Sequence, residues 1–196
     1  MPCKRLALFV GLLCSLGSFL LAVPNQFPES PAFPALGKGL IGGLTSGLSR
    51  EQTVETLQKN GFLGYRELQS DLIKSPVRWG GFAYELTCKF NANDQLELCL
   101  IQGEAGWQDF FYEDMVKPQW QTLRSRVDQA YGKPAHRIEF PDYFSVPFND
   151  VGGLVTDRWE LHDRTLLLTV QRYTQQDCCT RQVLDFSCCT LLIQPK

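Results

Sequence analysis

The residues of this chain best suited to chemistry are two pairs of adjacent cysteines near its carboxyl end. Cys178-Cys179 and Cys188-Cys189 supply four thiols, enough to hold a soft ion such as Zn²⁺ or Cu⁺. Metal-binding cysteines are usually separated by intervening residues, however, and adjacent residues of a strand point to opposite faces of the sheet. We therefore favour disulfide bonds to different partners. A metal-binding or thiol-redox protein that uses these pairs is the alternative.

The other cysteines fit a disulfide reading. Two of the 8 cysteines, Cys3 and Cys14, fall in an N-terminal segment that resembles an export signal. The remaining disulfide candidates are Cys88, Cys99, Cys178, Cys179, Cys188 and Cys189. An even number of cysteines in an exported chain is typical of disulfide bonding, and six cysteines allow fifteen connectivities.

The N-terminal segment predicts export. A short basic region is followed by an apolar stretch over 6–23, with a small residue at Ala22. This pattern predicts a signal peptide over residues 1–22 and a periplasmic or secreted protein. Two alternatives are an uncleaved anchor formed by residues 6–23 and a lipoprotein modified at Cys14. The lipoprotein is disfavoured because Leu12 and Leu13 stand where small residues are expected.

Composition narrows the choice of partner. The net charge of -2 offers no general attraction to nucleic acid or to an acidic membrane. We therefore expect the partner to be another protein or an envelope component. Contact with a membrane is expected only if the N-terminal segment stays uncleaved.

Sequence motifs of common enzyme classes are absent. The sequence contains no HExxH, no GxSxG, no dinucleotide-binding glycine pattern and no phosphate-binding loop. His136 and His162 are expected at surface or turn positions. Acidic residues gather in one stretch: Glu104, Asp109, Glu113 and Asp114. A hydrolase built on them is a marginal alternative, because no second motif converges with them. The sequence predicts a non-catalytic protein without catalytic residues, cofactor or metal.

Aromatic residues concentrate in two stretches that are candidates for partner binding. The first runs from Trp107 to Tyr112, and the second from Phe140 to Phe148. Aromatic side chains on loops carried by a rigid sheet often form partner sites. The candidate residues are Trp107, Phe110, Phe111, Tyr112, Tyr143 and Phe144. The alternative is that both stretches form a small satellite core that closes over the main helix.

The main helix is the most clearly defined element. Apolar residues recur at helical spacing from Val116 to Tyr131, and polar residues, among them Arg124, fill the other side. Pro118 is tolerated in a first turn, and Gly132 followed by Pro134 ends the pattern. We predict an amphipathic helix over 117–131 that covers a sheet with its Trp120 side.

The remaining pattern predicts an α+β domain over 50–196. Ser49 and Gln52 form a capping box for a short helix over 50–60, and the Pro- and Gly-rich residues 23–49 indicate a linker or arm. Expected strands lie at 84–90, 96–100, 135–140, 158–162, 165–173 and 183–193. We predict an antiparallel sheet of about five to six strands with both helices packed on one face.

The register of the first hairpin decides where two cysteines point. If Phe90 lies opposite Leu96, the apolar residues share a face, but Cys88 then points inward and Cys99 outward. If Cys88 lies opposite Cys99, Phe90 is set against Glu97. A slip of one residue inverts the apolar set, so we favour the first register and disfavour a Cys88–Cys99 bond.

Several features resemble uncharacterised exported bacterial proteins: the helix start at 47–51, the Phe90–Leu96 hairpin, the segment from Leu123 to Pro134, Trp159, and the strand that ends at Tyr173. These proteins are similar to the β-lactamase-inhibitor-like and SmpA/OmlA small α+β folds. The resemblance covers roughly 40–175 and consists of capping and turn signals. It implies an exported scaffold that acts by binding, with no catalytic residue to transfer.

Overall fold

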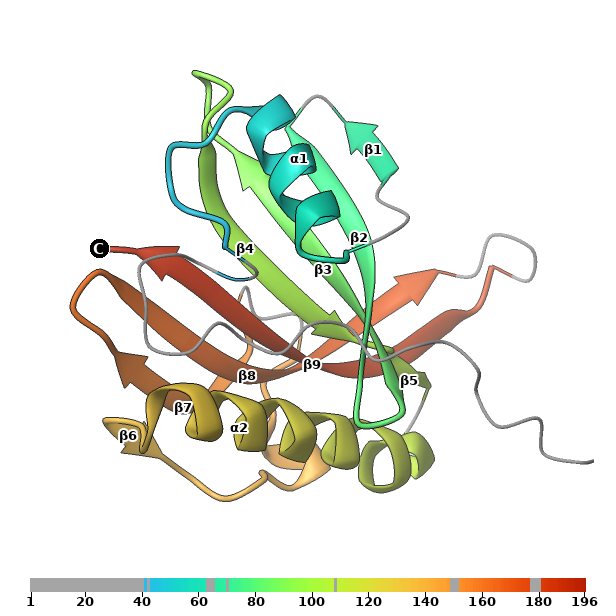
Figure 1. Ribbon diagram of the computed structural model, residues 1–196. Helices are drawn as coiled ribbons and strands as arrows, with labels where there is room; N and C mark the ends of the chain where they lie inside the picture. The colour runs from blue at the N-terminus through green and yellow to red at the C-terminus, as the bar shows by residue number, and fades with distance from the viewer. Residues whose placement is uncertain are drawn as a thin grey trace, which may run out of the picture.

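The computed structural model describes residues 41, 43–62, 66–69, 71–107, 109–148, 152–176 and 181–196. The predicted signal peptide, most of the predicted linker, and the pair Cys178-Cys179 lie outside these residues. The described chain forms one twisted antiparallel sheet that carries two α-helices (Figure 1). The predicted α+β class is therefore confirmed.

Nine strands are present in the described residues, more than the five to six expected. They are β1 (Arg66–Gln69), β2 (Leu72–Trp79), β3 (Phe82–Phe90), β4 (Leu96–Gly103), β5 (Gly106–Trp107), β6 (His136–Arg137), β7 (Leu154–Glu160), β8 (Arg164–Gln176) and β9 (Val183–Pro195). Eight of them follow the order β1-β2-β3-β4-β9-β8-β7-β6, while β5 pairs with β9 off this path. The predicted number was wrong because β1, β2 and β5 were not recognised.

The helices begin and end close to where the sequence predicts. The main helix, α2 (Lys117–Tyr131), ends at Gly132, whose φ of 81° is readily adopted by glycine. It continues a preceding π-helical turn, η1 (Tyr112–Val116). The shorter α1 (Arg50–Lys59) carries the predicted capping box between Ser49 and Gln52. A 3-10 turn, η2 (Tyr143–Ser145), lies in the second aromatic stretch.

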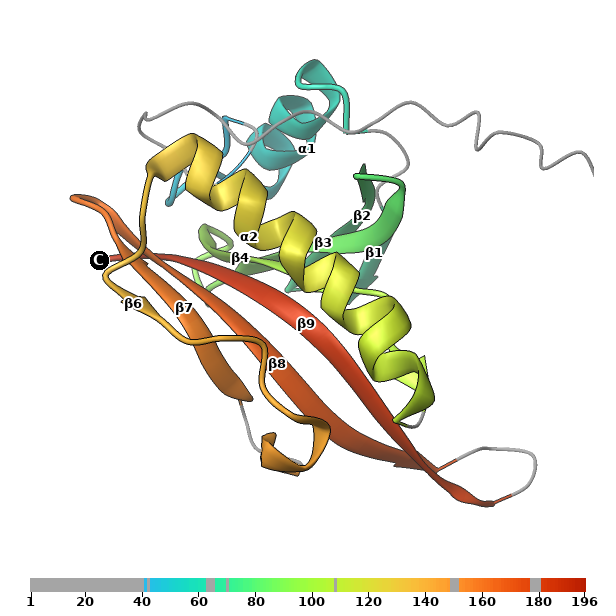
Figure 2. The ribbon, with the colours of Figure 1, turned by 90° about the horizontal axis from the view of Figure 1, so that it is seen from below.

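Both helices lie on the same face of the sheet, as predicted (Figures 1 and 2). On β3, the Tyr84 hydroxyl donates to the backbone carbonyl of Gln119 in α2, at 3.0 Å. The guanidinium of Arg50 in α1 stacks on the Phe90 ring, 4.6 Å from its centroid. Tyr84 and Phe90 are an even number of residues apart on one strand, so they share a face.

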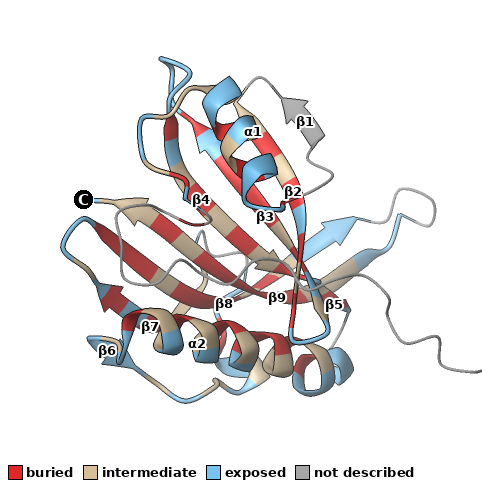
Figure 3. Cartoon of the chain, in the orientation of Figure 1, coloured by how far each residue is buried: buried red, intermediate tan, exposed pale blue. Residues whose placement is uncertain are grey.

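The core lies between this helix face and the helices. Buried and less buried residues alternate along several central strands, as the coloured bands in Figure 3 show. Trp120, Leu123 and Val127 of α2 are buried against the sheet, which confirms the expected orientation of that helix. The Gly80 turn between β2 and β3 also touches α2, since a Cβ at Gly80 would lie 2.9 Å from Thr122 Cγ2.

Residues 43–49 and Ile41 pack with the domain instead of forming a linker. Ile41 and Leu44 are fully buried. The backbone of Gly47 donates to the Leu96 carbonyl, and Leu96 donates to the Leu48 carbonyl, at 2.9 and 2.8 Å. These contacts place the described start of the domain at about residue 41, ahead of the expected boundary at 50.

The first hairpin satisfies both registers that the sequence offered as alternatives. Phe90 pairs with Leu96, and Cys88 pairs with Cys99. Both pairings coexist because a β-bulge adds Glu97 to β4 between them. The expectation that Cys99 points outward is therefore wrong, and Cys88 and Cys99 both face the core.

Candidate functional site

Large apolar side chains are exposed mainly at one end of the described structure. They are Trp107, Phe110, Phe111, Phe144, Phe148 and Val183. These residues lie on or beside the end of the sheet where β8 leads toward β9 and where β5 pairs with β9. We call this region the aromatic end. Exposed apolar patches on soluble proteins commonly mark interaction sites.

Tyr112 in η1 brings the two predicted aromatic stretches together. Its ring centroid lies 4.7 Å from that of Phe140 and 5.3 Å from that of Tyr143. Its hydroxyl donates to the Pro141 carbonyl at 2.8 Å. Burial raises the pKa of Tyr112. Because Tyr112 is only 1% exposed, it is the buried base of the aromatic end and not a contact residue.

Arg172 of β8 packs against the second aromatic stretch, Phe140 to Phe148. Its guanidinium lies 3.8 Å from the Tyr143 ring centroid and 4.2 Å from that of Phe148. It also donates through Nη1 to the Tyr143 carbonyl at 2.9 Å. Neither Arg172 nor Phe148 was among the predicted site residues, although Phe148 ends the second predicted stretch. Arg172 could have been found from the alternation of side chains along β8. Leu168 and Val170 point toward the core, and Arg172 is the next residue on the same face.

The exposed rings divide between the two faces of the sheet. Trp107 pairs with Phe186, and Phe186 stacks on Tyr173 with centroids 5.8 Å apart. Cross-strand partners share a face, so Trp107 lies on the face opposite Arg172. The partner candidates therefore separate. Phe110, Phe111, Tyr143 and Phe144 belong to the segments gathered around Tyr112, whereas Trp107 lies on the outer face.

Acidic residues surround the helix-face part of the aromatic end. Asp109, Glu113, Asp114 and Asp142 are all exposed. Lys117 pairs with Glu113, with Nζ 2.6 Å from Oε2, one helical turn apart. The segments that carry Phe110, Phe111 and Phe144 therefore have a net negative charge.

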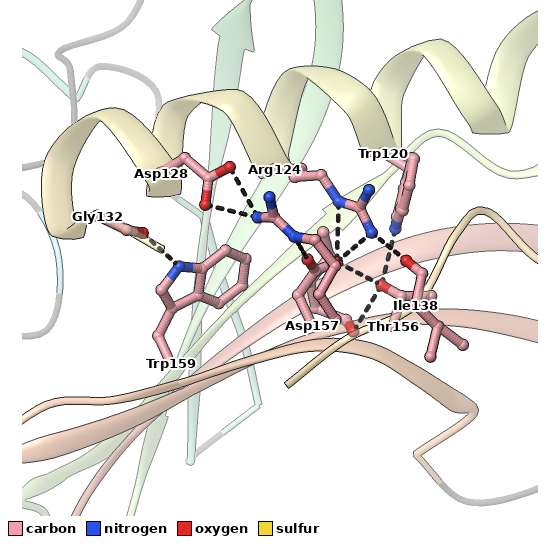
Figure 4. Close-up of polar contacts among 10 residues, drawn as sticks. Trp120, Arg124, Asp128, Gly132, Ile138, Thr156, Asp157 and Trp159 are labelled. Carbon is pink, nitrogen blue, oxygen red and sulfur yellow. Dashed lines mark hydrogen bonds and ion pairs between the residues drawn. The ribbon is translucent and has the colours of Figure 1, made fainter. Parts of the chain in front are cut away.

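A second cluster lies under the other half of α2 and is centred on Asp157 of β7 (Figure 4). The Asp157 side chain is fully buried. Arg124 donates to Asp157 Oδ2 through Nε and Nη2 at 3.0 and 2.9 Å, and Arg137 donates through Nε to Oδ1 at 2.7 Å. Thr156 donates to Oδ2 at 3.0 Å and accepts from Trp120 Nε1 at 2.8 Å.

The Asp157 cluster fixes the helix and leaves its carboxylate no free position for catalysis. Arg137 Nη2 lies 2.7 Å from both oxygens of Asp128 on α2, and Trp159 donates to the Gly132 carbonyl at 2.9 Å. Figure 4 shows these bonds linking α2 to the sheet. The Arg124 side chain is only 14% exposed. The predicted position of Arg124 on the solvent side is wrong, because a long arginine stem can turn back beneath the helix.

The described cysteines do not form a metal cluster. Cys188 and Cys189 are adjacent on β9, so their buried side chains point to opposite faces. Burial raises the pKa of Cys188 to about 12 and also raises that of Cys189. Within the described residues, no group of three His, Cys, Asp or Glu side chains is placed to hold a metal ion. His136 and His162 are exposed, as expected.

Two hollows lie near β3. Their volumes are about 280 and 100 Å³, and Tyr84 and Glu85 line both. Glu85 is paired with Lys74, and the Tyr84 hydroxyl is bonded to α2. These polar groups are therefore already engaged within the protein.

In fold class, this is an α+β protein with one antiparallel sheet. It exposes aromatic side chains at one end of that sheet. No protein-family model, curated protein or solved structure matches the chain. Among the described helices, none has the length and apolar character needed to cross a membrane.

Proposed function

We propose that this protein is an exported, non-catalytic binding protein that binds another protein or an envelope component through the helix-face part of its aromatic end. One observation carries the proposal: phenylalanines are exposed in the two segments that meet at buried Tyr112. Phe144 is 83% exposed and Phe110 is 67% exposed. Exposed rings on a fixed base lose little conformational entropy when a partner covers them.

The contacts beneath the exposed rings favour a surface that is already ordered before a partner binds. Tyr143 contacts buried Tyr112 on one side and the Arg172 guanidinium on another. Phe144 in turn meets Tyr143 edge to face, with centroids 5.2 Å apart. A ring supported in this way can bury most of its area against a partner, as residues that dominate binding energy usually do.

The surrounding charge favours a partner with a basic apolar segment. Asp109 and Asp114 are exposed near Phe110 in the sequence, and Asp142 precedes Tyr143. Lysine or arginine side chains could pair with these carboxylates and stack on the exposed rings. An acidic surface disfavours anionic lipid or nucleic acid as the partner.

Export is part of the proposal and rests on the sequence of residues 1–22. The resemblance to exported bacterial scaffolds points the same way, and both remain predictions. Binding through the aromatic end does not depend on whether residues 6–23 are cleaved or act as an anchor. It also does not depend on disulfide bonds at Cys178, Cys179, Cys188 or Cys189.

The direct test is site-specific photo-cross-linking in the cells that make the protein. A photoreactive phenylalanine analogue at position 144 is expected to give a discrete cross-linked protein. The matched control places the same analogue at His162, an exposed turn residue away from the aromatic end. The same product from both positions, or none from position 144, would contradict the proposal.

The captured protein then allows a quantitative test. The double variant Phe110→Ser/Phe144→Ser is expected to weaken its binding at least about tenfold, because rings at the centre of an interface supply most of the affinity. Trp107→Ser, on the outer face, is the control and should change binding much less. Circular dichroism should show that all variants remain folded.

A further inference from the structure

We infer that Cys88 and Cys99 are joined by a disulfide bond across β3 and β4 in the exported protein, an inference that rests on the export part of the proposed function. The two residues are direct partners in the antiparallel register. Their side chains share the helix face, and both residues are fully buried. This pairing is the one that sequence patterning disfavours, and the Glu97 bulge makes it available.

The backbone pattern places the pair at a site suited to bridging. The Phe90 amide donates to the Asp71 carbonyl at 2.9 Å, so the backbone groups of Phe90 point toward β2. Alternation along β3 gives Cys88 the same direction, which makes Cys88–Cys99 a non-hydrogen-bonded pair. Such pairs have Cα atoms about 4.5 Å apart, within the range of roughly 4.4–6.8 Å found for disulfides.

The Cys88 and Cys99 thiols are direct cross-strand neighbours on the helix face. Burial raises the pKa of the Cys99 thiol, and a hydrogen bond with Cys88 raises it further. In the structure all four described cysteines are unbonded thiols. The register therefore shows the reduced form of a pair that is in position to close without moving a strand.

The other described cysteines are poorly placed to compete. Cys99 pairs with Ile193 of β9, four residues along that strand from Cys189, which is roughly 13 Å at the rise of a β-strand. Cys188 points to the opposite face, where Gln102 Nε2 lies 3.8 Å from its sulfur. The register therefore selects Cys88 as the described partner of Cys99.

Formation of the bond needs an external disulfide, such as oxidised glutathione or the catalytic disulfide of a thiol oxidoreductase. One protein thiolate attacks that disulfide, forms a mixed disulfide and releases one external thiol. The second protein thiolate attacks the protein sulfur of the mixed disulfide and releases the other external thiol. Two protein thiols are oxidised, one external disulfide is reduced, and the thiol protons pass to the departing thiolates. Because both cysteines are buried, we expect this exchange to precede closure of the core.

The experiment uses the full chain, reduced and denatured, and then refolded in a glutathione redox buffer. Remaining thiols are alkylated under denaturing conditions, and the chain is digested with trypsin without reduction. Cleavage at Arg78, Lys89 and Arg124 places Cys88 in residues 79–89 and Cys99 in residues 90–124. The expected result is a linked product of these two peptides that dithiothreitol separates.

The other cysteines are distinguishable in the same digest. Cys178-Cys179 fall in residues 173–181, and Cys188-Cys189 fall in residues 182–196. A refolded chain in which Cys88 and Cys99 are both alkylated, or in which either is linked to another peptide, would overturn the inference. This outcome is independent of whether the aromatic end binds a partner.

Thermal unfolding gives a second readout. The oxidised chain is expected to melt roughly 5–10 °C above the chain refolded in dithiothreitol, because the bond restricts the unfolded state. The variant Cys88→Ala/Cys99→Ala should show no such difference, while Cys188→Ala should keep it. An equal difference in the double variant would show that another bond is responsible.

Discussion

An arginine lies against an aromatic ring at both ends of the helix face, but the two surroundings differ. Arg124 stacks on Trp120 with the guanidinium carbon 3.8 Å from the ring, and it is paired with the buried Asp157 carboxylate. Arg172 stacks at the same distance on Tyr143, yet it bonds to a backbone carbonyl and its Nε lacks a partner in the described residues. Arg124 is fixed by its ion pair with Asp157, whereas Arg172 is held mainly by contacts with aromatic rings.

This difference separates a structural cluster from a surface prepared for contact. Around Asp157, the carboxylate is enclosed and its hydrogen bonds are satisfied within the protein. At the aromatic end, the buried base of Tyr112 and Arg172 leaves rings such as Phe144 open to solvent. Buried polar networks fix a unique arrangement, whereas exposed apolar groups need a further partner to be covered.

The largest expected effect is at Asp157. Asp157→Ala leaves two arginines without their shared buried carboxylate, and we expect it to lower the free energy of unfolding by about 3–5 kcal/mol. Urea unfolding measures the loss. Asp109→Ala, which removes an exposed carboxylate, should stay within about 0.5 kcal/mol of the parent. Equal effects from the two variants would contradict the structural role of the Asp157 cluster.

A smaller effect on stability should distinguish the buried residues of the aromatic end from its exposed rings. Tyr112→Ala removes a buried ring and a hydrogen bond, and it is expected to cost about 3 kcal/mol of folding free energy. Phe144→Ala removes an exposed ring and should cost less than about 0.5 kcal/mol. The comparison uses the same urea assay. A large loss at Phe144 would mean that its ring is part of the core, as in the satellite-core alternative.

The smallest effect concerns an exposed ion pair on the same strand as Asp157. The hydrogen bond from Lys196 lowers the pKa of Glu160 below its usual 4.5, helped by Thr165 and by the charge of Arg158. A lowered pKa stabilises the folded state above the unfolded value, and this contribution is lost as the pH falls through the folded pKa. Lys196→Ala should raise the pKa of Glu160 toward 4.5 in an NMR titration of its carboxyl group. An unchanged value would exclude the Lys196 contact in solution.

The elements that could be predicted are those marked by residues close together in the sequence. The capping box at Ser49 and the glycine after Tyr131 mark helix ends through short-range hydrogen bonds and backbone angles, so both helices were placed correctly. The β2 strand was missed although Ile73, Val77 and Trp79 follow an alternating pattern. Pro76 interrupts this pattern, and proline usually argues against a central strand.

The structure explains why Pro76 is tolerated. It lies opposite Glu85, and the alternation on β3 directs the Glu85 backbone toward β4, so this pair shares no hydrogen bond. The nitrogen of Pro76 faces the β1 side, where the last β1 pairing is Arg66 with Lys74. Proline is accommodated at such an edge position because no ladder donor is needed there.

The candidate site was predicted only in part because its geometry is long-range. Both aromatic stretches were identified from composition, but their meeting at Tyr112 depends on how η1 docks beside the 140–148 segment. The division of Trp107 from the other rings depends on the β5–β9 register. The Asp157 cluster joins α2, β6 and β7, and no spacing within any one of these elements reveals it. The Glu97 bulge similarly reconciles two registers that simple alternation treats as exclusive.

Binding measured with the captured partner and the Phe110→Ser/Phe144→Ser variant tests the central claim most directly. We expect at least about a tenfold loss of affinity with unchanged folding, and little change for Trp107→Ser. A folded double variant that binds the partner as tightly as the parent would contradict a role for the helix-face rings in binding.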